Sequence, residues 1–136
     1  MNRLVITMGD PCGVGPEIIV KFFDGIYKVE DKRLFLVVVG SKSVLEYYKK
    51  KLRIDLEIVE ITKAHIVDGK LENGKLHLIN IDTDIDKLEF GKHTELGGAL
   101  SIKYLDKAIE LCHGKYVDGI VTCPISKDSI NMAGFK

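Results

Sequence analysis

Residues 34–39, Leu-Phe-Leu-Val-Val-Val, form an unbroken apolar run that constrains the fold more than any other feature. A strand with one wet face alternates apolar and polar residues, whereas a short unbroken run is typical of a strand covered on both faces of a parallel sheet. Parallel strands cannot be joined by tight hairpins and need crossover connections, which are usually helices. The run therefore predicts a central strand with helices on both sides of its sheet.

The rest of the chain alternates strand-like and helix-like segments, as this architecture requires. Strands are predicted for residues 4–7, 56–61, 76–81 and 118–122, and helices for residues 16–25, 41–52, 95–113 and 126–131. The 118–122 strand is expected to be buried, and the polar region around Gly69, Asn73 and Gly74 is expected to hold a turn or a hairpin. This order predicts an α/β fold with a mainly parallel sheet, and one unit over residues 1–136.

Side-chain patterns add detail to three of these helices. Ser41, Thr94 and Ser126 stand where an N-cap is expected. Within residues 95–113, apolar side chains recur at spacings of three, four and three and predict one buried stripe, made of Ile102, Leu105, Ile109 and Cys112. Gly97 and Gly98 in the first turn cost about 1 kcal/mol each relative to Ala.

Composition excludes several classes of protein. Twenty Lys and Arg balance twenty Asp and Glu, so no global field attracts nucleic acid or a membrane surface. The longest apolar run is too short to span a bilayer, and the first residues show no signal region. Three scattered cysteines suit a reducing compartment. We therefore expect a cytoplasmic protein with no nucleic-acid or membrane partner.

The first loop with possible chemistry follows the 4–7 strand, at the sheet edge where α/β proteins bind ligands. Gly13 and Gly15 would allow positive φ and a close approach to a ligand, and Asp10 could hold a hydroxyl group. The alternative is a tight turn in which Asp10 bonds its own backbone. The loop is neither a Walker A loop nor a full dinucleotide fingerprint, because Ile18 stands where the third Gly belongs.

The second such loop follows the 118–122 strand. Thr122, Pro124 and Lys127 place a hydroxyl group, a fixed turn and a cation at a strand exit, and Ser126 adds a second hydroxyl. Lys127 could bind a carboxylate or phosphate there. The alternative is a plain helix cap beside a solvated lysine. Cys123 is expected to be a packed residue and not a nucleophile.

The chain shows no metal-ligand spacing among its four histidines, which are expected to be structural or exposed. The alternating Asp82, Asp84 and Asp86 lack the Gly and Glu of a calcium loop and are expected to form a solvated acidic loop. No metal ligand is therefore predicted within residues 1–136.

Taken together, the two loops resemble one enzyme family. Residues 6–18, Ile-Thr-Met-Gly-Asp-Pro-Cys-Gly-Val-Gly-Pro-Glu-Ile, are similar to the opening of 4-hydroxythreonine-4-phosphate dehydrogenases. Residues 121–127, Val-Thr-Cys-Pro-Ile-Ser-Lys, with Ala133-Gly134 after them, resemble that family's central motif, and residues 97–100 also match. The resemblance covers the whole chain but only about the first two-fifths of a usual family member.

The resemblance implies an NAD-dependent oxidoreductase of pyridoxal 5′-phosphate biosynthesis that oxidises 4-hydroxythreonine 4-phosphate, a small phosphorylated substrate. It implies a homodimer of two-lobe subunits, similar in fold to isopropylmalate and isocitrate dehydrogenases, and a divalent metal held by three histidines. Asp10, Gly13, Gly15, Thr122, Pro124 and Lys127 carry over as residues lining the substrate and cofactor cleft. The metal ligands and the substrate-binding His would lie beyond residue 136, so no catalytic residue carries over.

Residues 1–136 are accordingly expected to be the N-terminal lobe of a larger enzyme, with the second lobe absent, and to be inactive alone. Three alternatives stay open. The chain could be a phosphate- or nucleotide-binding module, a truncated product or expression fragment without function, or part of a dehydrogenase of a related 4-phosphorylated hydroxy acid.

Overall fold

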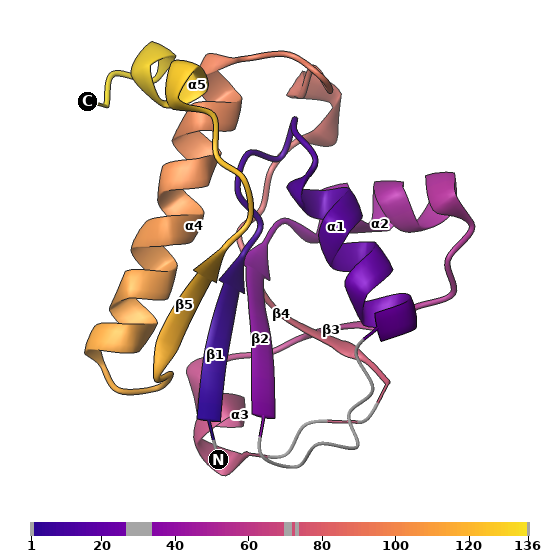
Figure 1. Ribbon diagram of the computed structural model, residues 1–136, viewed down its shortest axis with the longest axis vertical. Coiled ribbons are helices and arrows are strands. Elements are labelled where there is room, and N and C mark those ends of the chain that lie inside the picture. The colour runs from indigo at the N-terminus through magenta and orange to yellow at the C-terminus, as the bar shows by residue number, and fades with distance from the viewer. Residues whose placement is uncertain (1, 27–33, 70–71, 73, 136) are drawn as a thin grey trace.

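The computed structural model describes residues 2–26, 34–69, 72 and 74–135 (Figure 1). Five strands alternate with five α-helices, one π-helical turn (η1) and one 3₁₀ turn (η2) in this described part of the chain. In chain order they are β1 (Asn2–Thr7), α1 (Gly15–Lys21), η1 (Phe22–Ile26), β2 (Leu34–Gly40), α2 (Lys42–Leu52), β3 (Ile58–Glu60), α3 (Lys63–Asp68), β4 (Leu76–Asn80), η2 (Ile85–Lys87), α4 (Glu95–His113), β5 (Gly119–Thr122) and α5 (Lys127–Met132).

The five strands form one sheet in the order β3-β4-β2-β1-β5, and every neighbouring pair is parallel. Residue Val5 of β1 stands level with Val37 of β2 on one side and Ile120 of β5 on the other. Residues 35–40 are all buried, which confirms the predicted central strand. The predicted α/β class with a mainly parallel sheet is confirmed as well.

Helices cover the sheet from two sides. Helix α4 packs against β1, β2 and β5, while α1 packs against α2, and Figure 1 shows the two groups on opposite sides of the strands. The core between them contains fully buried Val5, Val37, Leu45, Tyr104 and Leu111. No helix in the described part of the chain has the length and apolarity needed to cross a membrane.

The predicted buried stripe of α4 is wrong. Ile109 is 49% exposed, and Ile102, Leu105 and Cys112 are only half-buried. The buried side of the helix consists instead of Gly97, Gly98, Leu100, Ser101, Tyr104, Ala108 and Leu111. These residues follow the same helical spacing, but most are small or carry a hydroxyl group, and apolarity alone does not identify them.

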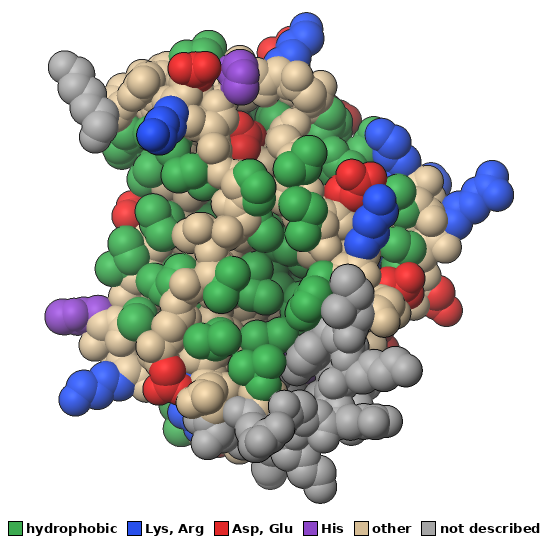
Figure 2. Space-filling model, in the orientation of Figure 1, with side chains coloured by type: hydrophobic (Ala, Val, Ile, Leu, Met, Phe, Trp, Pro, Cys, Tyr) green, Lys and Arg blue, Asp and Glu red, His purple; other side chains and the backbone are tan. Residues whose placement is uncertain are grey.

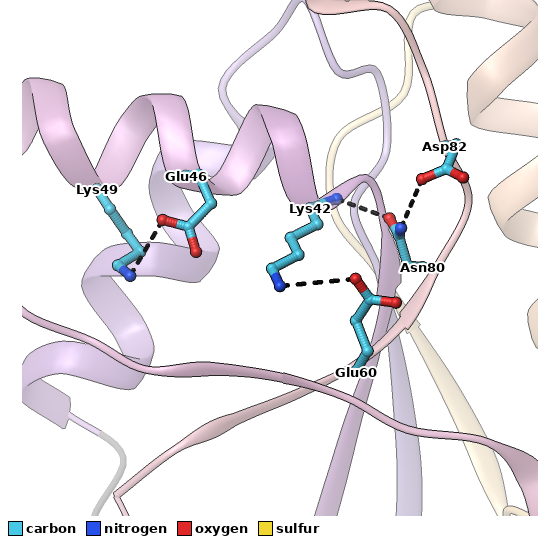
Figure 3. Close-up of polar contacts among 6 residues, drawn as sticks. All are labelled: Lys42, Glu46, Lys49, Glu60, Asn80 and Asp82. Carbon is cyan, nitrogen blue, oxygen red and sulfur yellow. Dashed lines mark hydrogen bonds and ion pairs between the residues drawn. The ribbon is translucent and has the colours of Figure 1, made fainter.

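The N-terminus of α2 also differs from the prediction, because Ser41 does not cap it. The Asn80 side-chain oxygen, at the end of β4, accepts the Lys42 backbone N–H at 2.8 Å, and the Lys42 ammonium pairs with Glu60 at 3.6 Å (Figure 3). The Ser41 hydroxyl donates to the Ile81 carbonyl at 2.6 Å and receives the Tyr104 hydroxyl at 2.5 Å. Two neighbouring strands and α4 are thereby tied to the start of α2.

Three further expectations change. The 56–61 strand is reduced to Ile58–Glu60, and no hairpin follows it, because α3 intervenes and β3 and β4 run parallel. Residues 70, 71 and 73 of the expected turn lie outside the described residues. The 118–122 strand is not buried: β5 is at the edge of the described sheet, Val121 is 47% exposed, and Thr122 is exposed.

Candidate functional site

A hollow of about 380 Å³ lies at the carboxyl ends of β1 and β5. Three loops line it: the turn between β1 and α1, the loop before α4, and the turn between β5 and α5. The lining residues are Asp10, Cys12, Gly13, Val14, Gly91, Lys92, His93, Pro124, Ile125 and Ser126. Ligands of open parallel sheets bind at this edge, so the hollow is the candidate site.

Asp10 is the buried carboxylate of this hollow, with only 4% of the residue exposed. Its Oδ1 accepts the Cys12 backbone N–H at 2.8 Å, which closes a turn of the kind that Asp forms with its own backbone. Its backbone N–H donates to the Pro124 carbonyl at 3.2 Å, so the first and third loops are joined directly. The alternative interpretation of Asp10, as a turn residue, is therefore present in the structure.

Hydrogen bonds hold the three loops together. The Cys123 N–H donates to the Thr7 carbonyl at 3.0 Å, which continues the pairing with β1 one residue beyond the end of β5. The Gly91 N–H donates to the Cys12 carbonyl at 2.8 Å, and the Thr94 N–H donates to the Ser129 hydroxyl at 3.1 Å. The walls of the hollow are thus joined mainly through backbone groups.

His93 and Ser126 meet at the rim. The Ser126 Oγ caps α5 by accepting the Ser129 N–H at 3.1 Å, as predicted, and lies 2.8 Å from Nδ1 of His93. Lys92 stands beside them and pairs loosely with Glu89, at 3.7 Å between exposed groups. Exposed pairs of this kind contribute at most about 1 kcal/mol, so the Lys92 ammonium can readily exchange Glu89 for a ligand.

Close packing requires a glycine at Gly15 but not at Gly13, and the expected positive φ is wrong for both of them. Positive φ occurs instead at Gly9, with φ of 72°. A Cβ on Gly15 would lie 2.0 Å from the Met8 carbonyl oxygen, so only Gly fits there. A Cβ on Gly13 would come no closer than 3.4 Å to the Asp10 carbonyl oxygen, so this position is far less restricted.

The two cysteines near the hollow are buried thiols. Burial raises the pKa of Cys123 to about 11 and is also the main cause of the raised pKa of Cys12. Both thiols stay protonated at neutral pH, and a protonated thiol is a poor nucleophile. The prediction that Cys123 is a packed residue is confirmed, with 9% exposure.

The six residues predicted to line a cleft occupy different positions. Asp10, Gly13 and Pro124 line the hollow. Gly15 is buried at the start of α1, while Thr122 and Lys127 are exposed at the end of β5 and the start of α5, outside the hollow's lining. The roles of all six in binding stay predictions.

Lys92 and His93 were missed as candidates because no motif surrounds them. A topological signal was available, since α4 connects β4 to β5 and must begin at the carboxyl edge of the sheet. The loop before α4 therefore belongs to the same edge as the two motif loops. The described residues contain no cluster of three or more His, Cys, Asp or Glu side chains arranged to hold a metal ion.

Comparisons with known proteins identify the family of this chain. The family model described as "Pyridoxal phosphate biosynthetic protein PdxA" matches residues 32–136. A 4-hydroxythreonine-4-phosphate dehydrogenase of Sulfurihydrogenibium sp. is 37% identical over 135 residues, which are 99% of this chain and 39% of that protein. A Fusobacterium nucleatum protein, provisionally named D-threonate 4-phosphate dehydrogenase, is 40% identical over 95% of this chain and 38% of its own length.

A solved structure shows the same fold. The crystal structure of a 4-hydroxythreonine-4-phosphate dehydrogenase from Burkholderia phymatum superposes with a TM-score of 0.85 and 26% identity, over all of this chain and 40% of that one. The chain thus spans about two-fifths of the length of these relatives. Since the family model covers most of the chain, this protein belongs to the PdxA family of pyridoxal phosphate biosynthetic proteins.

Proposed function

We propose that this chain forms the N-terminal part of an NAD-dependent dehydrogenase that oxidises 4-hydroxythreonine 4-phosphate in pyridoxal 5′-phosphate biosynthesis. The observation that carries the proposal is the convergence of both family motifs on one hollow, where Asp10 and Pro124 are joined through a backbone hydrogen bond. The match to the PdxA family and the names of the relatives support the same activity.

Within that enzyme, the hollow would form one wall of the cleft for the phosphorylated substrate and NAD. Asp10 would accept a hydroxyl group of either molecule, and the rim donors would face its phosphoryl groups. The nicotinamide ring would receive the hydride when bound. The described residues do not fit a metal centre, and the divalent metal of the family is assigned no role on this chain.

We further propose that residues 1–136 are one lobe of a two-lobe subunit. Support comes from an apolar groove of about 320 Å³ formed by α1 and the β1, β2 and β5 strands, which includes Ile18 and Val121, exposed by 45% and 47%. Figure 2 shows this patch of hydrophobic side chains at the centre of the face. The occupant would be polypeptide equivalent to the three-fifths of the relatives that this chain does not match.

A fusion experiment tests these proposals. The chain is joined to the unmatched part of the Sulfurihydrogenibium relative, and NADH formation is followed with 4-hydroxythreonine 4-phosphate. We expect turnover by the fusion and none by either part alone. Asp10→Asn should slow turnover, whereas Asp118→Asn, remote from the hollow, should not. A folded but inactive fusion would refute the proposed activity.

A related substrate is the second candidate, favoured by the 40% identity to the Fusobacterium nucleatum protein. The same fusion is assayed with D-threonate 4-phosphate, and the ratio of the two kcat/KM values decides between the substrates. A fusion that prefers D-threonate 4-phosphate would replace the first assignment. We also expect a cytoplasmic protein that forms a homodimer. Light scattering on the fusion would test the homodimer.

A stand-alone binding module is the remaining alternative. Calorimetry on the 136-residue chain with inorganic phosphate and with NAD separates it from a catalytic part. Sub-millimolar binding together with an inactive fusion would favour the module.

A further inference from the structure

His93 and Ser126 form a hydrogen bond whose direction depends on a proton. The Ser126 Oγ already accepts the Ser129 N–H, so its own proton is its remaining donor. When Nδ1 of His93 carries no proton, the Ser126 O–H donates to it across the 2.8 Å contact. When the ring is doubly protonated, Nδ1–H donates to Ser126, and the Ser126 O–H is free to point into the hollow.

The charged groups around the hollow determine which kind of ligand the freed Ser126 O–H would bind. Asp10 is the one carboxylate in the lining, and Lys92 and His93 are the lining side chains able to carry positive charge. The other charged groups nearby are exposed and screened by water: Glu89 beside Lys92, Glu95 at the start of α4, and Lys127 and Asp128 at the start of α5. With His93 neutral, Asp10 offsets Lys92, and the lining carries no net charge.

We propose that this hollow is a phosphoryl oxyanion subsite that takes up one proton on His93 when it binds. The oxyanion would accept the Ser126 O–H and lie beside the His93 imidazolium and the Lys92 ammonium. The inference rests on the proposed function, because both the phosphorylated substrate and the dinucleotide cofactor carry such a group. His93 is a positioning residue in this scheme, since it turns the Ser126 hydroxyl toward the ligand.

Proton uptake has a measurable consequence. A ligand that binds the protonated form better must lose affinity as pH rises and His93 loses its proton, because binding and protonation are linked. Sulfate is a suitable first probe, since it is tetrahedral and keeps its charge across the neutral range. We expect its dissociation constant to be about tenfold or more higher at about pH 8 than at about pH 5.

The experiment is a titration of the 136-residue chain with sulfate at constant ionic strength, followed by amide NMR signals at both pH values. The signals of residues 92–94 and 126 should move together and saturate. His93→Gln should bind sulfate equally at both pH values, no tighter than the unmodified chain at high pH. His113→Gln, changed at the opposite end of α4, should retain the full pH dependence.

A second variant separates the donor role of Ser126 from its role as a cap. Ser126→Asp keeps a strong helix-capping acceptor but replaces the hydroxyl donor with a negative charge. It should leave α5 folded and weaken sulfate binding more than tenfold at low pH. Unchanged binding by this variant, or equal sulfate affinity of the unmodified chain at both pH values, would overturn the inference.

Competition identifies the source of the oxyanion. NAD and 4-hydroxythreonine 4-phosphate are each added to the sulfate complex, and the one that displaces sulfate is the natural occupant. Failure of both to displace it would overturn the link to the proposed cleft. The fusion assay is independent of this result: an active fusion without a sulfate site refutes only the subsite, and a pH-dependent sulfate site in an inactive fusion refutes only the activity.

Discussion

Gly98 lies in the first turn of α4 where α5 crosses it, and replacing it with Ala should destabilise the fold although Ala is the better helix former. A Cβ at this position would lie 1.9 Å from the Ser129 carbonyl oxygen and 2.3 Å from its carbonyl carbon. Both atoms belong to the α5 backbone, so no rotamer change can relieve the overlap. Helix α5 must therefore move away from α4.

The magnitude follows from three contributions. Gly→Ala in a helix interior stabilises by about 1 kcal/mol. Overpacking against fixed backbone costs about 1–3 kcal/mol, and the displacement also weakens the bond from the Thr94 N–H to the buried Ser129 hydroxyl, by about 1 kcal/mol. The expected net loss is about 1–3 kcal/mol, a large share of the roughly 5–15 kcal/mol that stabilises a typical domain.

Urea unfolding followed by circular dichroism measures this loss. Gly25→Ala is the matched control, because Gly25 is exposed and a Cβ there would meet no atom within 4 Å. We expect the control to be as stable as the unmodified chain or slightly more stable. If Gly98→Ala were instead stabilised by about 1 kcal/mol, as at an open helix position, the close contact of α4 with α5 would be refuted.

Three further predictions concern the core. Tyr104→Phe removes the hydroxyl that donates to Ser41 and should cost about 1 kcal/mol in the free energy of unfolding; no loss in urea unfolding would contradict the network. Asn80→Ala leaves the N-terminus of α2 without its acceptor and should cost about 1 kcal/mol by the same assay. Asn80→Asp keeps that acceptor but loses the amide that donates to Asp82 at 2.7 Å and places two carboxylates together, so it should restore only part of the loss. Burial lowers the pKa of His77, so the unfolded chain takes up a proton first as pH falls, and stability should decline below about pH 6.5. His77→Gln should lose less stability in that range than the unmodified chain, whereas His113→Gln should behave like it.

The elements that sequence reasoning found are those with local causes. Every residue of the 34–39 run is apolar, so its burial on both faces could be predicted from the run itself, and residues 35–39 are buried. Thr94 caps α4 by accepting the N–H of Gly97, three residues along. The cap of α2 has no local cause. Asn80 reaches Lys42 from a neighbouring strand, 38 residues away in sequence, and only the strand order β4-β2 brings them together.

The candidate site shows the same division. Asp10 and Pro124 follow strands that end at the carboxyl edge of the sheet, so their meeting could be predicted from topology. The direction of the Lys127 side chain could not be predicted with the same accuracy. Each further residue at the start of a helix rotates the side chain by about 100° around the helix axis. Ser126 faces the hollow, and Lys127 does not line it.

Glycine pairs explain why the hollow can exist at all. Gly97 and Gly98 look like a defect in a long helix, yet a Cβ on Gly97 would lie 2.7 Å from Oδ1 of Asp10, just as one on Gly98 would strike α5. Gly9 and Gly15 also lie against backbone atoms: a Cβ on Gly9 would lie 2.4 Å from the Pro124 carbonyl oxygen, and one on Gly15 would lie 2.0 Å from the Met8 carbonyl oxygen. The helix propensity lost in the first turn of α4 is thus exchanged for contact with the first motif loop and with α5. A larger residue at position 97 should therefore displace Asp10 and the Thr94 hydroxyl, which a Cβ there would approach to 2.9 Å, and should lower the free energy of unfolding measured in urea.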